Sequence, residues 1–303
     1  MTPPPLIVIS ASRRTDIPAF YMDWFMASID SGGFEVENPF NRRRFRVAST
    51  PDRVSVIVFW SKNFGPFLER GDGNRLSAMG YNLFFNFTVN GGSPPLEAHL
   101  PPLNDRLDQL AQLCETFGPD VINWRFDPVC FFTQGNGGIE NNTGVFSRIA
   151  DRAGRLGIRR CITSFMDMYP KIRKRSGGDG SLHYIEPSMA VRVETATAMA
   201  GTLAPHGIRL MLCCEPDVLA LLPEYSGVGE SACISGQLLS QLFDRPVPLR
   251  RDRGQRTASG CRCTVSSDIG SYRRHPCPHN CHYCYANPAA EPVTKGPGEP
   301  SPK

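Results

Sequence analysis

Short apolar runs of strand length recur along the chain, and segments with helical spacing separate most of them. The runs cover residues 6–10, 54–60, 83–88, 121–126, 161–165 and 208–213. Apolar residues recur at helical intervals in residues 18–29, 107–117, 145–156 and 187–203. Because the strand-like runs are apolar throughout rather than alternating, they predict parallel strands that are covered on both faces. The pattern therefore predicts an α/β fold.

The number of strand–helix units narrows the architecture. Six units fit a complete or partial (β/α) barrel of the TIM type, while a doubly wound open sheet is the alternative, because periodicity does not reveal barrel closure. Residues 34–47 predict an extra hairpin after the first helix. We expect a barrel-like domain over residues 1–250 and a cysteine-rich segment packed on it over residues 251–287. Residues 288–303 form a Pro- and Gly-rich tail that we expect to be disordered.

Composition excludes several classes of protein. The chain has 303 residues, of which 41% are hydrophobic and 20% charged, so it has enough apolar residues to form a full hydrophobic core. No apolar run approaches the roughly 18 residues of a membrane span. The first residues carry neither the basic lead nor the long apolar stretch of a signal peptide. We therefore expect a cytoplasmic protein that does not interact with a membrane. A net charge of +4 does not by itself indicate nucleic-acid binding.

Charged residues follow the predicted strands, where parallel α/β folds bind their ligands. Polar strand ends are common in any loop, but here they occur after all six runs, which favours one polar pocket. Arg125 and Asp127 alternate with aromatic residues and so share one face of a strand. The candidates for catalysis, by proton transfer or by orienting the ligand, are Asp16, Arg125, Asp127 and Asp167. The candidates for binding an anionic group are Arg13, Arg14 and Lys62.

Two basic stretches, residues 42–46 and 171–175, have the charge to contact a polyanion, although a solvated surface explains them as well. The alternatives for a partner are thus a small-molecule or nucleotide-like anionic substrate and a nucleic acid.

The cysteines are distributed unevenly. Six of the eleven are scattered through apolar segments, where a thiol usually behaves as a small hydrophobe. The other five lie between residues 261 and 284. Cys277, Cys281 and Cys284 have the spacing to bind three irons of a [4Fe–4S] cluster and leave the fourth iron open. Zinc is the alternative, with a fourth ligand from nearby residues: Cys261, Cys263, His275, His279 or His282.

The sequence Cys277-Pro-His-Asn-Cys281-His-Tyr-Cys284 resembles the cluster loop of radical S-adenosylmethionine enzymes, and its Tyr-Cys-Tyr-Ala ending is similar to the spore photoproduct lyase branch. The whole chain resembles a prokaryotic domain-of-unknown-function family, numbered eighteen forty-eight, from about residue 7 to residue 287. The motifs that carry this likeness are Ser12-Arg-Arg-Thr-Asp-Ile-Pro-Ala-Phe-Tyr21, Asn38-Pro-Phe-Asn41, Val58-Phe-Trp-Ser-Lys-Asn63, Trp124-Arg-Phe-Asp-Pro128 and the cysteine block.

The resemblance to radical enzymes implies a [4Fe–4S] cluster on the three cysteines, S-adenosylmethionine on the fourth iron, Tyr283 near the adenine, and a reductant protein as electron donor. Two departures stand against it. The cysteine loop closes the chain instead of following the first strand, and no Gly-Gly-Glu segment follows. In addition, Cys261 or Cys263 is able to occupy the open iron. The alternative is a closed iron–sulfur or zinc module that binds nucleic acid or transfers electrons without S-adenosylmethionine chemistry.

Overall fold

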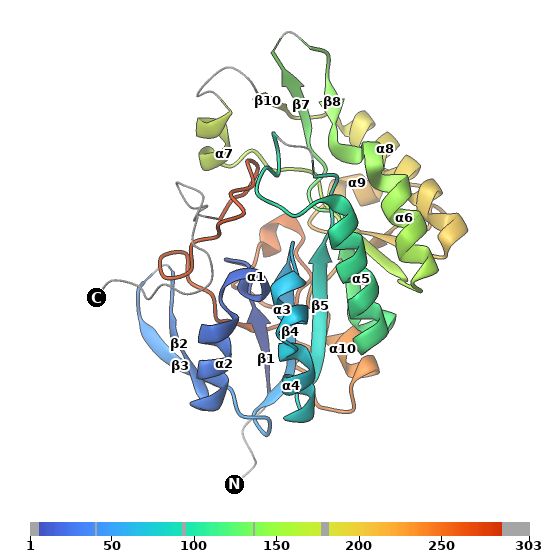
Figure 1. The fold of residues 1–303 in the computed structure, drawn as a ribbon. Helices are drawn as coiled ribbons and strands as arrows, with labels where there is room; N and C mark the ends of the chain where they lie inside the picture. Colours follow the sequence, from blue (N-terminus) through green and yellow to red (C-terminus); the bar gives the residue numbers. More distant parts are fainter. Residues whose placement is uncertain (1–5, 40, 93–94, 136, 177–181, 287–303) are drawn as a thin grey trace.

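The structure is a computed structural model that describes residues 6–39, 41–92, 95–135, 137–176 and 182–286 (Figure 1). The tail predicted over residues 288–303 lies outside the described residues. No helix in the described ranges combines the length and the apolar composition that crossing a membrane requires.

A parallel sheet of eight strands forms the centre of the molecule. Its order is β12-β11-β9-β6-β5-β4-β1-β13, and every recorded pairing between these strands is parallel. The strands are β1 (Ile7–Ala11), β4 (Val54–Ser61), β5 (Leu83–Thr88), β6 (Ile122–Arg125), β9 (Arg160–Thr163), β11 (Arg209–Leu212), β12 (Gly229–Glu230) and β13 (Ser267–Asp268). The six apolar runs are therefore confirmed as strands, and the α/β prediction is correct.

The strands follow one another across the sheet in chain order, and the last strand, β13, pairs with the first, β1. The order lacks the reversal that marks a doubly wound sheet. In the described residues β12 and β13 form no pairing, so the sheet is not closed.

Most helices cover one face of this sheet (Figure 1). They are α1 (Ile17–Phe20), α2 (Met22–Asp30), α3 (Gly65–Glu69), α4 (Asp72–Ala78), α5 (Leu103–Phe117), α6 (Phe146–Arg155), α8 (Met189–Leu203) and α9 (Pro216–Leu221). The helix predicted over residues 18–29 is split at Tyr21, whose φ of −131° interrupts the helix. The other three predicted helices correspond to α5, α6 and α8.

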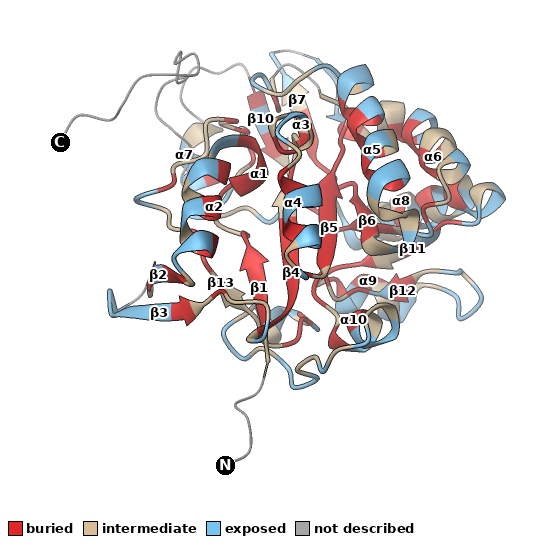
Figure 2. Ribbon diagram, turned by 60° about the horizontal axis from the view of Figure 1, so that its bottom comes forward, coloured by how far each residue is buried: buried red, intermediate tan, exposed pale blue. Residues whose placement is uncertain are grey.

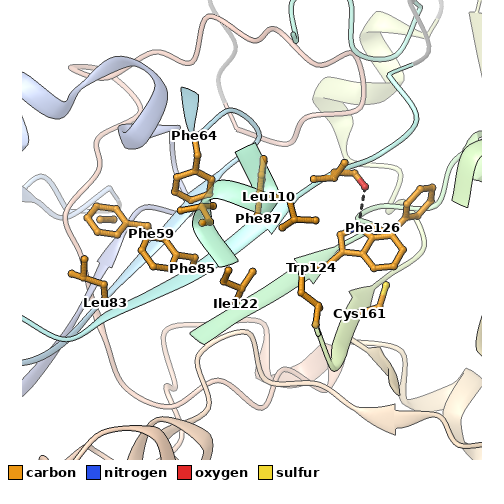
Figure 3. Close-up of a cluster of buried hydrophobic side chains, with 14 of the residues drawn as sticks. Phe59, Phe64, Leu83, Phe85, Phe87, Leu110, Ile122, Trp124, Phe126 and Cys161 are labelled. Atoms are coloured by element: carbon orange, nitrogen blue, oxygen red, sulfur yellow. Dashed lines mark hydrogen bonds between the residues drawn. The ribbon is translucent and has the colours of Figure 1, made fainter. Parts of the chain in front are cut away.

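The core between sheet and helices is rich in aromatic rings (Figure 3). Phe59, Phe64 and Phe85 are completely buried, and the ring centroid of Phe85 lies 6.0 Å from that of Phe59 and 5.6 Å from that of Phe64. Trp124 on β6 is also buried, and its Nε1 donates to the carbonyl oxygen of Val89 at 3.1 Å. Edge-to-face and stacked rings add to the free energy gained from burying their area.

The opposite face of the sheet buries a second cluster. Val8, Val58 and Phe84 project from it against α10 (Gly236–Leu242) and the segments around Cys233 and Cys263. Figure 2 shows that the sheet is buried nearly throughout, as strands covered on both faces must be.

Two smaller sheets extend the fold. β2 (Gly33–Glu37) and β3 (Arg44–Ala48) form the predicted hairpin. β7 (Phe131–Gln134), β8 (Glu140–Asn141) and β10 (Leu182–Ile185) form an antiparallel sheet beyond the carboxyl ends of the parallel strands, beside α7 (Pro170–Arg175) (Figure 1). The cysteine-rich segment contributes β13, so it is also part of the main sheet.

Candidate functional site

Asp16 connects three parts of the chain at the carboxyl ends of the strands. Its Oδ1 accepts hydrogen bonds from the N–H of Ala19 (3.0 Å) and from Ser61 Oγ (2.7 Å), so it caps α1 and holds the end of β4. Its Oδ2 accepts from the N–H of Lys62 (2.8 Å) and contacts Nε2 of His279 (2.9 Å). These four contacts use the acceptor capacity of a carboxylate. Asp16, predicted as a catalytic residue, therefore positions the cysteine segment on the sheet.

Lys62 and Tyr283 meet at a buried carboxylate, Glu97. Nζ of Lys62 lies 2.7 Å from Oε1 of Glu97 and 2.8 Å from the hydroxyl of Tyr283, which donates to the same Oε1. Asn90 donates to the Tyr283 hydroxyl at 2.9 Å. The side chain of Arg106, which is fully buried, places Nη1 3.7 Å from Oε2 of Glu97. Two predicted binding residues thus share one network with three residues that were not predicted.

The charges of this network are mutually stabilised. Burial alone would raise the pKa of Glu97, but Lys62 and Arg106 outweigh burial and hold that pKa below its usual value. Burial alone would lower the pKa of Lys62, but Glu97 and Cys281 outweigh burial, and the pKa lies above its usual value. Burial, with Glu97, raises the pKa of Tyr283 well above its usual value, so the phenol stays protonated. The carboxylate and the ammonium ion are therefore both charged inside the protein.

Cys277, Cys281 and Cys284 lie at this end of the sheet and are close enough to interact electrostatically with one another. Asn280, with a φ of 48°, turns the backbone between them, a conformation that Asn tolerates better than most residues. Cys281 is buried and interacts with Lys62 and Glu97. Burial raises the pKa of all three thiols.

The backbone around these cysteines is held by side chains from other parts of the fold. Arg175 on α7 donates to the carbonyl oxygens of Cys281 (3.1 Å) and Cys284. The N–H of His282 donates to the carbonyl oxygen of Leu96 at 2.9 Å. The sulfur of Cys277 interacts with the backbone N–H groups of Asp16 and His279, and that of Cys284 with Ala286. Hydrogen bonds of this kind tune sulfur ligands of iron.

Arg13 and Arg125 lie on the face of the sheet away from most helices. Their guanidinium groups are 5.0 Å and 5.1 Å from the ring centroid of Trp60. Arg125 pairs with Asp127 at 2.5 Å, and Ser164 Oγ donates to Asp127 at 2.6 Å. Although burial would raise the pKa of Asp127, Arg125 and Ser164 lower it. The two side chains meet, although β6 ends at Arg125 and Asp127 lies beyond the strand.

The remaining predicted ligand-binding and catalytic residues do not join this group. Nη1 of Arg14 donates to the carbonyl oxygen of Gly270 at 2.9 Å, and its guanidinium lies 6.0 Å from the ring centroid of Tyr272. The side chain of Asp167 is 53% exposed and pairs with Arg256. The structure therefore separates Arg14 and Asp167 from the network around Glu97.

Cys261 and Cys263 lie with other cysteines. Among the described residues their thiols contact Cys214 and Cys233, rather than Cys277, Cys281 or Cys284. No group of three or more His, Cys, Asp or Glu side chains in the described ranges is already gathered as the ligands of one metal ion.

A protein-family model, the domain of unknown function DUF1848, matches residues 8–286. The chain belongs to this family. No curated protein matches it. Among solved structures, a D-hydantoinase has a TM-score of 0.30 and 11% sequence identity, and the match covers 83% of this chain and 68% of that one. At that TM-score the likeness supports no conclusion about fold or function.

The family match does not identify the residues that sequence reasoning missed. Arg106 lies on the apolar face of α5, in register with Leu107, Leu110 and Leu113, so its burial was visible in the helical spacing. Glu97 follows Leu96 in a loop without periodicity and gave no signal. Glu215 follows β11, and the sequence does not distinguish it from any other carboxylate at a strand end. Burial raises its pKa to about 7, and it accepts a hydrogen bond from the N–H of Phe165 at 2.8 Å.

The contacts of Asp16 predict a large effect on stability. Replacing it in Asp16→Ala removes an N-cap and leaves buried donors unpaired, so we expect the free energy of unfolding to fall by about 3 kcal/mol. Chemical denaturation measures this change. In the exposed control Asp108→Ala the change should stay within about 0.5 kcal/mol. Equal effects of the two substitutions would contradict the positioning role.

Glu97 gives a second prediction. Glu97→Gln keeps the shape of the side chain but leaves Lys62 and Arg106 without their counter-charge, so we expect a loss of about 3 kcal/mol in the free energy of unfolding. The exposed Glu194→Gln on α8 is the matched control. A loss below about 1 kcal/mol would show that the buried cations do not depend on Glu97.

Proposed function

We propose that Cys277, Cys281 and Cys284 hold a [4Fe–4S] cluster, and that the protein uses it for radical or redox chemistry on a small charged ligand. The observation that carries this proposal is the position of the cysteine loop. Asp16 and Arg175 fasten the loop over the carboxyl ends of the strands, where it contacts the Lys62–Glu97 pair. Parallel α/β sheets bind ligands at that edge.

The environment of the three sulfurs fits such a cluster. Backbone N–H groups face the sulfurs of Cys277 and Cys284, while Lys62 supplies positive charge beside Cys281. A cubane takes each cysteine on a different iron, so its ligands need not gather around a single point. A bound cluster would supply single electrons, which is the chemistry that cleavage of S-adenosylmethionine requires.

The contacts of Cys261 and Cys263 support a fourth iron that is not capped by a cysteine. Cys261 and Cys263 are engaged with Cys214 and Cys233. The two thiols that the sequence offered as a fourth protein ligand are thus used elsewhere. This arrangement favours S-adenosylmethionine chemistry over a cluster closed by one of these two cysteines.

The charged residues indicate how a ligand would be held. The side chain of Lys62, which is 18% exposed, offers an ammonium group beside the loop that suits the carboxylate of an amino-acid moiety such as that of S-adenosylmethionine, while the buried Glu97 holds Lys62 in place. Asp127 stays ionised and orients Arg125. Glu215, whose pKa burial raises to about 7, is suited to take up or release a proton near neutral pH.

The architecture supports the same placement of the site. We propose that the sheet is a partial TIM-like barrel, on the basis that its strands follow chain order and β13 lies beside β1. In such a barrel the segment after the last strand lies at the same edge as the end of the first, which brings the cysteine loop to the ends of β1 and β4.

A small-molecule ligand fits the surface charges better than a nucleic acid. In the basic stretch over residues 42–46, Arg44 lies 3.8 Å from Glu37 and Arg46 lies 3.9 Å from Glu35. In the second stretch, Arg175 binds the cysteine loop. Because one-electron chemistry needs an electron source, the proposal includes a reductant protein as partner.

The proposal predicts iron and a paramagnetic signal. Anaerobically prepared protein should contain iron and sulfide, and after reduction its electron paramagnetic resonance spectrum should show a [4Fe–4S] signal that shifts when S-adenosylmethionine is added. Cys281→Ala should remove the signal, whereas Cys114→Ala, a buried cysteine on α5, should keep it. Protein that holds stoichiometric zinc and negligible iron would overturn the proposal.

The open fourth iron makes a separate prediction. If neither Cys261 nor Cys263 binds the cluster, Cys261→Ser and Cys263→Ser should retain the iron content and the spectral shift with S-adenosylmethionine. Formation of 5′-deoxyadenosine under a strong reductant gives an independent readout. Loss of the cluster in either variant, with folding intact by circular dichroism, would show a closed site instead.

A further inference from the structure

A ring of five cysteine sulfurs lies on the face of the sheet away from most helices, apart from the Cys277–Cys284 loop. Sγ of Cys213 is 3.9 Å from Sγ of Cys214 and 3.6 Å from Sγ of Cys233. Cys263 contacts both Cys233 and Cys261, and Cys214 contacts Cys261, which closes the ring. All five are free thiols.

Three separate parts of the chain supply these sulfurs. Cys213 and Cys214 follow β11, Cys233 follows β12, and Cys261 and Cys263 precede β13. Successive side chains in a strand point to opposite faces, yet both sulfurs of the Cys213–Cys214 pair join the ring. Cys214 has a φ of +61°, which breaks the alternation and turns its side chain toward that of Cys213. Such a conformation is unfavourable for a residue with a Cβ and persists where the surroundings enforce it.

We propose that the four buried cysteines, Cys213, Cys233, Cys261 and Cys263, bind one zinc ion with tetrahedral coordination. Four sulfurs about 2.3 Å from a zinc ion lie about 3.8 Å from one another. The separation of 3.6 Å between Cys213 and Cys233, two of the proposed ligands, matches that edge. A [4Fe–4S] cluster would spread the sulfurs wider, since each cysteine binds a different iron. Binding requires the side chains to turn inward from the ring, because no three ligands are yet gathered around one point.

Two buried cations distinguish an ion site from simple packing of thiols, which would give similar separations. Nη1 of Arg125 lies 2.6 Å from Sγ of Cys233, and the guanidinium of Arg13 interacts with Cys263. A neutral thiol is only a weak acceptor, so it gives a buried guanidinium little stabilisation. A thiolate bound to zinc accepts a hydrogen bond from a guanidinium more strongly than a neutral thiol does, which accounts for the cations beside Cys233 and Cys263. Asp127 and Asp268 also interact with these arginines and carry the opposite charge.

The position of the ring gives the ion a structural role. In the described residues β12 and β13 do not pair, and the four ligands come from the end of β11 and from segments that adjoin these two strands. An ion held by them would join the two sides of the gap where the sheet is not closed. Structural zinc sites with four cysteines contribute their binding free energy to folding in this way.

Metal analysis of the full chain tests the proposal. The triple variant Cys277→Ala, Cys281→Ala, Cys284→Ala removes the ligands of the proposed iron cluster, so that zinc at the ring is measured alone and survives even if the iron proposal fails. We expect one zinc per chain in both the wild type and the triple variant. Titration with Co²⁺ should produce the absorption of a tetrahedral tetrathiolate site.

Single substitutions test the ligand set. Cys233→Ser and Cys263→Ser should lower zinc affinity by at least about tenfold. Cys214→Ser, in the same ring but partly exposed, and Cys114→Ser, which is buried elsewhere, should keep both zinc and the cobalt spectrum. An unchanged zinc affinity in Cys233→Ser, loss of zinc in Cys214→Ser, or iron at the ring of the triple variant would overturn the proposal.

A further measurement on the triple variant requires no substitution of the five cysteines in the ring. Alkylation followed by mass spectrometry compares protein loaded with zinc and protein treated with a chelator. Zinc should protect the four ligands while Cys214 reacts in both samples. Equal labelling of all five cysteines with and without zinc would exclude the site even if the serine variants failed to fold.

Discussion

The arrangement of the candidate site depends on one buried carboxylate, that of Asp16. It accepts hydrogen bonds from α1 and from the end of β4, and it contacts His279 in the cysteine segment, 263 residues further along the chain. Asp268 of the same segment provides a second charged anchor, since it accepts hydrogen bonds from Ser12 and from the N–H of Arg13 at the end of β1. Asp16 fixes the backbone of Lys62 on one side and His279 on the other, which helps to bring the Lys62–Glu97 pair to Tyr283.

The strands were predictable because strands covered on both faces are continuous apolar runs, and their length excluded helices. β12 and β13 could not be found in this way, since each has two residues and neither is part of an apolar run. For the same reason the sequence did not show how the sheet ends. The hairpin of β2 and β3 was predicted, whereas the sheet of β7, β8 and β10 was not, because its strands are short and lie in long polar loops.

The candidate site was predictable only where one segment carries its own chemistry. The spacing of Cys277, Cys281 and Cys284 indicates a metal ligand set without reference to the fold. In the same way, the alternation of charged and aromatic residues predicts that Arg125 lies beside Asp127. Contacts between distant segments were not visible. Cys213 and Cys233 were interpreted as core thiols, and Cys261 and Cys263 as neighbours of the tail cysteines, because proximity in sequence does not determine which sulfurs meet in space.

The pairing of β13 with β1 has a consequence for biosynthesis. Ser10 and Asp268, which bond to each other at 3.0 Å, are 258 residues apart, so β1 stays without one of its neighbours until all the residues between them have been synthesised. Contacts with such large sequence separation form slowly, and unpaired strand edges promote aggregation. One edge of β1 therefore stays unpaired while the rest of the sheet is being made.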